Sequence, residues 1–321
     1  MYPPSFLFLA IGMASLPPLL SFVLWTNATL LLQSAAVAMI VRRWSAAFVA
    51  MAAPWAMFCL LLGQDGLLTA AIVGFVLIQL ERRQILAGLL LALLSYKPQF
   101  GLLFPVALAF GGYWRAFIAA ALGVGLLVLA SGLAFGFTSW SVFFQALHIA
   151  GGQMQAWPGL LSAYGYARRL GLPYEAAIIL QTILGASVAV LVAACWRSKI
   201  SYDLKAASIA LCIPLVTPYL WDYDLTLISI ALAFMYKSRW FDRIDWIGVA
   251  IACLVVAAIP FGIFASFPGN NLPAGLIACA AIGVLLLRRC SPRPSHPKYS
   301  PDKSMDFLSP PGRAGTSAPA L

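Results

Sequence analysis

The sequence predicts an all-α integral membrane protein, a bundle of about eleven transmembrane segments of which some are short or broken. Hydrophobic residues make up 62% of the 321 residues and charged residues only 9%, too little charge for a soluble domain of this size. The apolar residues fall in long continuous runs and do not alternate, which argues against a β-barrel. The charges stand in short clusters between these runs, so the net charge of +10 is typical of cytoplasmic loops and not of nucleic-acid binding.

The apolar runs give the predicted membrane segments. They lie at about 5–41, 45–62, 67–80, 84–96, 99–111, 116–135, 176–196, 206–220, 225–236, 245–267 and 272–287. The first run is too long for one helix and contains Pro17-Pro18. It therefore predicts a re-entrant or interfacial piece over 5–18, followed by one span.

Cationic residues occur at every second connector between these runs. They are Arg42-Arg43, the ERR sequence at 81–83, Arg115, Arg197 with Lys199 and Lys205, Lys237 with Arg239 and Arg243, and Arg288-Arg289. The positive-inside rule places all of them in the cytoplasm. The connectors 63–66, 95–99, 136–175, 218–224 and 267–272 then share the opposite, external face. This alternation favours two short crossings broken at Lys97-Pro98 over a single kinked helix at 84–110.

The chain divides into a transmembrane domain over 1–290, with its long external loop at 136–175, and a tail over 291–321. The tail is rich in Pro and Ser and poor in apolar residues, which predicts a disordered cytoplasmic segment. The six cysteines show no CxxC spacing and there are only two histidines. The sequence therefore predicts no metal site and no cofactor, and it leaves a divalent metal open.

Three cations remain on the predicted external side: Lys97, Arg168 and Arg169. A charged side chain at mid-membrane costs about 2.5–3.5 kcal/mol on insertion scales. Lys97 either snorkels to the headgroups from a helix end or receives an anionic lipid phosphate at the start of a helix. Arg168-Arg169 either contacts headgroups generically or makes a bidentate phosphate contact.

Three acids on the same face are further candidates. Asp222 and Asp224 in TPYLWDYDL, and Asp65 in GQDG, either cap the following helices or serve as ion partners in a site. No single spacing is specific. Their joint placement on one face is the stronger signal.

Four stretches carry a family resemblance: YPPSFLF at 2–8, GQDGLLTA at 63–70, AGLLLALLSYKPQFGLLFPVAL at 87–108 and TPYLWDYDLTL at 217–227. They resemble bacterial glycosyltransferase family 87, mannosyltransferase-like enzymes of the GT-C superfamily that use polyprenyl-phosphate sugars. The resemblance runs from about Tyr2 to Leu232 and specifies neither the sugar nor the acceptor.

The resemblance implies a multi-pass GT-C-like bundle in the bacterial inner (plasma) membrane, with an extracytoplasmic active face and a cytoplasmic tail. The implied reaction is inverting transfer of a hexose, mannose-like, from a polyprenyl-phosphate donor to an unknown glycan or lipid acceptor. Lys97, then Arg168 and Arg169, would bind the donor phosphate. Sugar or donor contacts are expected from Gln64, Tyr96, Gln99, Trp157 and Tyr223, with Tyr164 and Tyr166 as further rings for stacking.

The start of the chain departs from the family pattern. Family members usually begin with another transmembrane helix and an external loop that carries the catalytic acid, and YPP follows that loop. Here YPP starts at Tyr2, so we expect that helix and that base to be absent. The start is misassigned, the chain is a non-catalytic copy, or an internal acid substitutes. Asp222 is the first candidate for such an acid, with Asp224 and Asp65 behind it.

Two other classes of function fit the same residues. A lipid-phosphate or small-solute transporter also uses broken helices and a buried cation, although the chain shows no internal repeat. The other is a non-catalytic membrane subunit that binds polyprenyl phosphate for a partner.

Overall fold

The computed structural model describes residues 2–153 and 160–239, all within the first of two compact units, Met1–Cys290. The predicted segments at 245–267 and 272–287, the tail at 291–321 and Trp157 lie outside the described residues. The regular secondary structure of the described part is helical, apart from one isolated antiparallel bridge between Leu160 and Trp221. The all-α prediction is confirmed there, and the number of about eleven segments stays a prediction.

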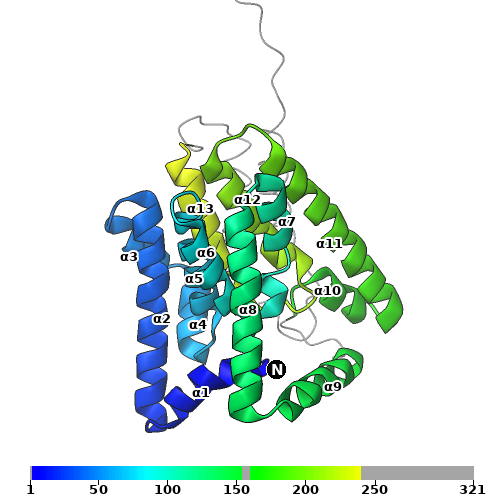
Figure 1. Ribbon diagram of the computed structural model, residues 1–321. Coiled ribbons are helices and arrows are strands. Elements are labelled where there is room, and N and C mark those ends of the chain that lie inside the picture. The colour runs from blue at the N-terminus through cyan, green and yellow to red at the C-terminus, as the bar shows by residue number, and fades with distance from the viewer. Residues whose placement is uncertain (1, 154–159, 240–321) are drawn as a thin grey trace, which may run out of the picture. The chain divides into compact units, whose positions relative to one another are not determined.

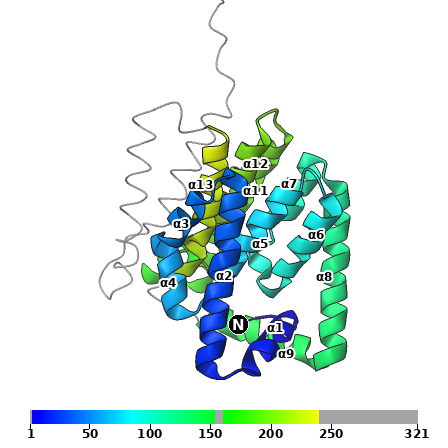
Figure 2. The same ribbon diagram turned by 90° about the vertical axis from the view of Figure 1, so that its left-hand side faces the viewer.

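Figures 1 and 2 show the arrangement of the helices from two sides. The elements in chain order are η1 (Pro4–Phe6), α1 (Leu7–Ala14), α2 (Pro18–Val41), α3 (Ser45–Met51), α4 (Pro54–Leu62), α5 (Gly66–Gln79), α6 (Gln84–Ala92), η2 (Leu93–Tyr96), η3 (Pro98–Phe100), α7 (Phe104–Gly111), α8 (Trp114–Phe135), α9 (Thr138–Gln153), α10 (Ala163–Arg169), α11 (Tyr174–Arg197), α12 (Tyr202–Val216), η4 (Asp222–Thr226) and α13 (Leu227–Lys237).

Three described helices, α2, α8 and α11, are long and apolar enough to cross a membrane. Their outward side chains are large and apolar, and Leu19, Leu133 and Val190 are about 70% exposed or more. A soluble protein would bury such residues, so these surfaces are typical of contact with lipid. The predicted span over 45–62 is instead two helices, α3 and α4, bent by 60°. Pro54 begins α4, where its missing N–H is tolerated.

Prolines break the chain at the two predicted places. Helix α1 ends at Ala14 and α2 begins at Pro18, so the first run does divide near Pro17-Pro18. The segment 84–111 is likewise two short pieces that separate at Lys97. Lys97 has φ −139° and ψ 66°, outside the helical region, because the ring of a following proline disfavours that region.

The cation-bearing connectors meet at one end of the described helices, the upper end in Figure 1. A cavity of about 480 Å³ at this end is lined by residues of several of them, including Arg42, Arg43, Glu81, Arg82, Tyr202 and Lys237. Asp65 precedes α5 and Asp224 lies just before α13. These two acids therefore stand at the other ends of helices that lead to the cations. This arrangement agrees with the predicted alternation of connectors.

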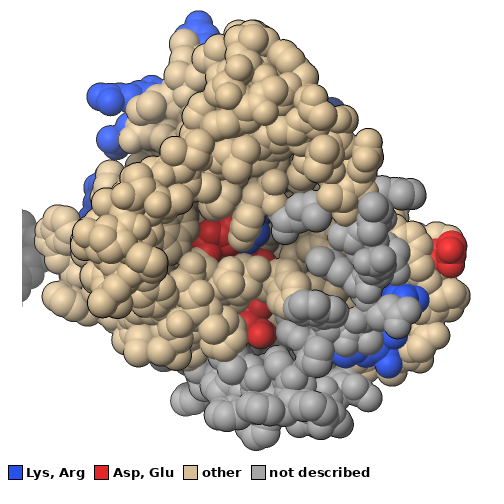
Figure 3. Space-filling model, turned by 90° about the horizontal axis from the view of Figure 1, so that it is seen from below, with Lys and Arg blue, Asp and Glu red and all other residues tan. Residues whose placement is uncertain are grey.

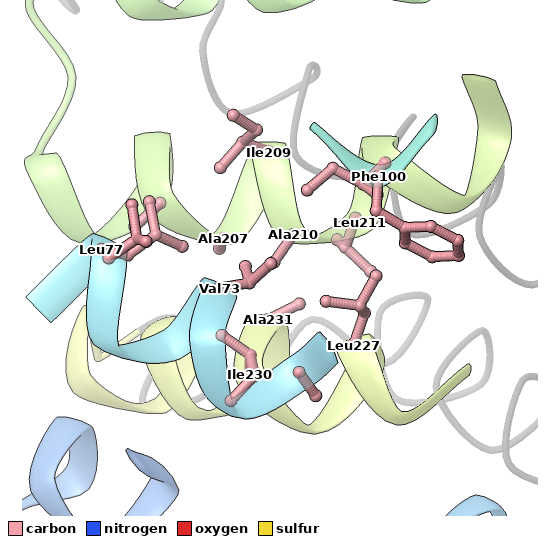
Figure 4. Close-up of a cluster of buried hydrophobic side chains, with 14 of the residues drawn as sticks. Val73, Leu77, Phe100, Ala207, Ile209, Ala210, Leu211, Leu227, Ile230 and Ala231 are labelled. Atoms are coloured by element: carbon pink, nitrogen blue, oxygen red, sulfur yellow. The ribbon is translucent and has the colours of Figure 1, made fainter. Parts of the chain in front are cut away.

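The core is made by helices that are far apart in sequence. Figure 4 shows side chains of α5, η3, α12 and α13 packed together, among them Val73, Ala210 and Ile230. Small residues bring helices close: a Cβ on Gly123 of α8 would lie 2.7 Å from the Cβ of Ala92 in α6. Small residues at helix contacts are typical of membrane bundles, where packing and not the exclusion of water drives association.

Candidate functional site

A buried cluster of three charges joins three connectors. The Lys97 Nζ atom lies 2.8 Å from Asp65 Oδ1 and 2.6 Å from Asp224 Oδ1. The three residues are only 4%, 3% and 0% exposed, respectively. One ammonium and two carboxylates leave the cluster with a formal net charge of −1. Charges buried to this degree are rare unless they are paired, and in membrane proteins they mark functional sites.

Gly66 lets the connector that carries Asp65 (63–66) approach the connector that carries Asp224 (218–224). Any Cβ on Gly66 would overlap the carbonyl oxygen of Tyr223, so only glycine fits there. The Thr226 hydroxyl donates to the Gly66 carbonyl at 2.7 Å, and the Cys59 thiol donates to the Tyr223 carbonyl at 3.4 Å. These contacts fix the backbone that carries Asp65 beside the backbone that carries Asp224.

Lys97 points into the protein and does not snorkel outward. Its ammonium lies over the rings of Phe100 and Tyr223, 4.8 and 4.9 Å from their centroids, in the geometry of cation–π contacts. Burial lowers the pKa of Lys97, but Asp224 and Asp65 raise it by more. The residue therefore stays charged and is the counter-ion of both carboxylates.

Asp224 both caps a helix and pairs with a cation, the two roles expected from its position in the sequence. Its Oδ2 accepts a hydrogen bond from the Trp221 amide at 3.0 Å, which caps η4, while Oδ1 accepts from Lys97. Both oxygens are thus engaged. Burial raises the pKa of Asp224 to about 6, against the opposing effect of Lys97.

Asp65 differs from Asp224 in that one of its two carboxylate oxygens has no hydrogen-bond partner among the described residues. It stands at the N-cap position of α5 but makes no side-chain cap hydrogen bond, because its Oδ1 accepts from Lys97 instead. Its Oδ2 is buried and has no hydrogen-bond partner among the described residues. The Tyr2 hydroxyl lies near enough that burial and Asp65 raise the pKa of Tyr2, but no hydrogen bond of standard geometry joins the two. A buried carboxylate oxygen without a donor is costly and therefore suggests a ligand.

A cavity of about 630 Å³ opens beside Asp65 between α1 and α2, and we call it the α1–α2 cavity. Helix α5 has 14 residues and is therefore about 21 Å long, shorter than a hydrocarbon core of about 30 Å. The charged residues at the start of α5 therefore lie deeper than the ends of helices that span the whole hydrocarbon core. Seen from the lower end of Figure 1, the surface has a hollow with acidic and basic atoms on its floor (Figure 3).

Arg168 and Arg169 lie on α10, outside the charge cluster. Arg168 donates to the Leu172 carbonyl at 2.9 Å, and Arg169 lies 5.9 Å from the centroid of the Tyr166 ring. Burial lowers the pKa of Arg169, whereas Tyr166 and Asp222 raise it, so Asp222 is near this guanidinium. The Leu161 amide donates to the Leu220 carbonyl at 2.8 Å, which ties the start of α10 to the connector of Asp222.

The expected sugar contacts differ in access. Gln64 lines the α1–α2 cavity, and Gln99 and Tyr223 are partly exposed. The Tyr223 ring stacks on Trp221 with centroids 6.3 Å apart.

Two of the other expected tyrosines are buried. The Tyr96 hydroxyl lies 2.6 Å from Thr69 Oγ1, and the Tyr164 ring is 1% exposed. Sequence reasoning missed Trp25, whose indole donates to the Gly63 carbonyl at 3.0 Å. A single indole within a long apolar run gave no separate signal.

No group of three or more metal-ligating side chains occurs in the described ranges. What the geometry defines is a helical membrane protein with a buried ionic site at one end of its short helices. The chain belongs to glycosyltransferase family 87, whose family model matches residues 1–218, and that family implies a membrane glycosyltransferase. No curated protein and no solved structure matches the chain.

Proposed function

We propose that the protein transfers a mannose-like sugar from a polyprenyl-phosphate donor to an extracytoplasmic acceptor, with inversion at the anomeric carbon, in the bacterial inner membrane. The observation that carries the proposal is the buried cluster of Lys97, Asp65 and Asp224. Two of the family motifs, GQDG and KPQ, and the DYD sequence supply its three charges. The absence of cations from the connectors of Asp65 and Asp224 supports an external site.

The reaction needs a group that takes the proton of the acceptor hydroxyl. A positioned general base typically contributes 10²- to 10⁴-fold. Among the three acids considered, Asp65 suits this task best because it lines the α1–α2 cavity and its Oδ2 has no hydrogen-bond partner among the described residues. Asp224 uses both oxygens internally. Asp222, the acid that the sequence suggested first, is not among the residues that line this cavity, so we favour Asp65 as the base.

The reaction also needs positive charge near the departing lipid phosphate. At rest Lys97 is balanced by two carboxylates. When Asp65 accepts the proton of the acceptor, the formal charge of the cluster changes from −1 to 0. The ammonium then attracts the leaving phosphate more strongly at the moment when the phosphate gains charge. Arg168 and Arg169 are the further candidates for donor phosphate contacts.

The test is transfer by the protein reconstituted in nanodiscs. Polyprenyl phosphate carrying radiolabelled mannose is supplied together with total lipid and glycan extracts from the source membranes, and labelled products are counted. The proposal predicts labelled acceptor with wild type and a loss of 10²-fold or more with Asp65→Asn. Labelled donor that is taken up into sealed vesicles without transfer would instead make the protein a transporter. Donor binding without turnover would make it a non-catalytic subunit.

A further inference from the structure

We propose that the α1–α2 cavity is the acceptor site, and that the acceptor is a lipid whose uncharged head donates a hydroxyl to Asp65 Oδ2. This inference rests on the function proposed above, because it names the acceptor class of the same site. It follows from three properties of the cavity: its largely apolar walls, the presence of Asp65 in its lining, and the absence of Lys and Arg from the described residues that line it.

The walls of the α1–α2 cavity fit a hydrocarbon chain. They are formed by side chains of α1, of α2 and of the turn between them, and include Leu9, Met13, Leu16 and Phe22. The volume of about 630 Å³ lies within the usual range of small-ligand sites, about 300–1,000 Å³. The outer surfaces of α2 are apolar and exposed, so a lipid could enter from the bilayer without crossing water.

Polar side chains also line the cavity: those of Tyr2, Ser21, Trp25, Gln64 and Asp65. Asp65 is 3% exposed, and its Oδ2 has no hydrogen-bond partner among the described residues. A buried carboxylate oxygen in this state calls for a hydrogen-bond donor. A hydroxyl on the head of a lipid in the cavity supplies that donor.

Charge decides between an uncharged lipid and a lipid phosphate. Among the described residues that line the cavity, none is Lys or Arg, and Asp65 is acidic. Asp65 is paired with the ammonium of Lys97, which is held by two carboxylates at 2.8 and 2.6 Å. A phosphate in the α1–α2 cavity would therefore meet a net negative charge, whereas a neutral hydroxyl gains a charge-assisted hydrogen bond. The polyprenyl-phosphate donor is thus expected outside this cavity.

The step is balanced within the two substrates and Asp65. The acceptor hydroxyl oxygen forms a bond to the anomeric carbon of the sugar and gives its proton to Asp65 Oδ2. The bond from that carbon to the phosphate oxygen breaks, and the polyprenyl phosphate leaves with the electron pair. The proton on Asp65 is then released to solvent or to the phosphate.

The test is photolabelling without donor, so it needs no turnover. Two probes carry the same diazirine in one alkyl chain: a dialkylglycerol with a free hydroxyl and its phosphate monoester. Crosslinks to the wild-type protein in nanodiscs are mapped by mass spectrometry. We expect the dialkylglycerol to label α1 and α2 at least 10-fold more than the phosphate probe, with competition by unlabelled dialkylglycerol and not by polyprenyl phosphate.

Variants separate the cavity from the lipid-facing surface and from simple misfolding. Ala10→Phe fills the cavity and should reduce labelling about 10-fold, whereas Ala28→Phe, on the exposed face of α2, should not. Asp65→Asn keeps a hydrogen-bond acceptor and removes the charge, so labelling by the phosphate probe should rise toward that of the dialkylglycerol.

Equal or stronger labelling by the phosphate probe in wild type, or competition by polyprenyl phosphate, would overturn the inference and give the cavity to the donor. Selective dialkylglycerol labelling in a protein that transfers no sugar would overturn the proposed function instead.

Discussion

Replacing Lys97 with Met tests whether this lysine holds two buried carboxylates together. The variant leaves Asp65 and Asp224 without their cation, at positions 3% and 0% exposed. At 2.6–2.8 Å and an effective dielectric constant of about 20, each attraction is about 6 kcal/mol before desolvation is subtracted. Measured losses on removing one partner of a buried pair are about 3–5 kcal/mol. We expect a loss in that range, limited by protonation of one carboxylate.

The assay is thermal unfolding in detergent at pH 7.5, followed by tryptophan fluorescence. For a helical unit of this size, the expected loss corresponds to a Tm decrease of roughly 5–15 °C. The matched control is the triple variant Lys97→Met/Asp65→Asn/Asp224→Asn, which removes all three charges of the cluster and should recover most of the loss. A Tm for Lys97→Met within 1 °C of wild type would refute the reasoning, because the two carboxylates would then not depend on the lysine.

Three further predictions concern neighbouring residues. Lys97→Ala should reduce sugar transfer far more than membrane expression, and unchanged turnover in this variant would contradict the role of Lys97 in phosphate binding. Lys97→Arg should restore transfer only in part, since a planar guanidinium does not replace a compact ammonium. Gly66→Ala should lower the free energy of unfolding by about 1–3 kcal/mol through overpacking against Tyr223, as measured by thermal unfolding. The control is Gly125→Ala, whose added Cβ meets no neighbour within 4 Å. Burial raises the pKa of Asp224 to about 6, above its value in the unfolded chain, so ionised Asp224 destabilises the folded state. Lowering the pH from above 6 toward 4 should therefore raise the Tm of wild type relative to that of Asp224→Asn. Tm curves of the two proteins that run parallel over this pH range would contradict the prediction.

The sequence predicted those parts of the fold that depend on local signals. The breaks near Pro17-Pro18 and Lys97-Pro98 follow from the backbone limits of proline, which act within one or two residues. The gathering of cationic connectors at one end follows from counting charges along the chain. The bend before Pro54 was missed because the flanking residues are uniformly apolar, so the run looked continuous.

The residues of the candidate site could be predicted from the sequence, but the ion pairs between them could not. Lys97, Asp65 and Asp224 were each singled out, and the acids were considered as ion partners, but no pattern paired them with Lys97. The two ion pairs join residues 32 and 127 positions apart, and they form because Gly66 lets two connectors touch. Such a contact depends on tertiary packing, which a residue pattern does not report.

The spacing of the cluster along the chain has a consequence for biosynthesis. Asp65 and Lys97 are separated by 32 residues, so at about 5–20 residues per second they leave the ribosome within seconds of each other. As a neutral pair they offset part of the roughly 2.5–3.5 kcal/mol that a lone lysine costs during insertion. Asp224 follows 127 residues after Lys97 and adds the second negative charge only when the hairpin around it is made. The formal charges of Asp65 and Lys97 thus cancel before Asp224 is made, and the cluster reaches its net charge of −1 only as the last described helices are added.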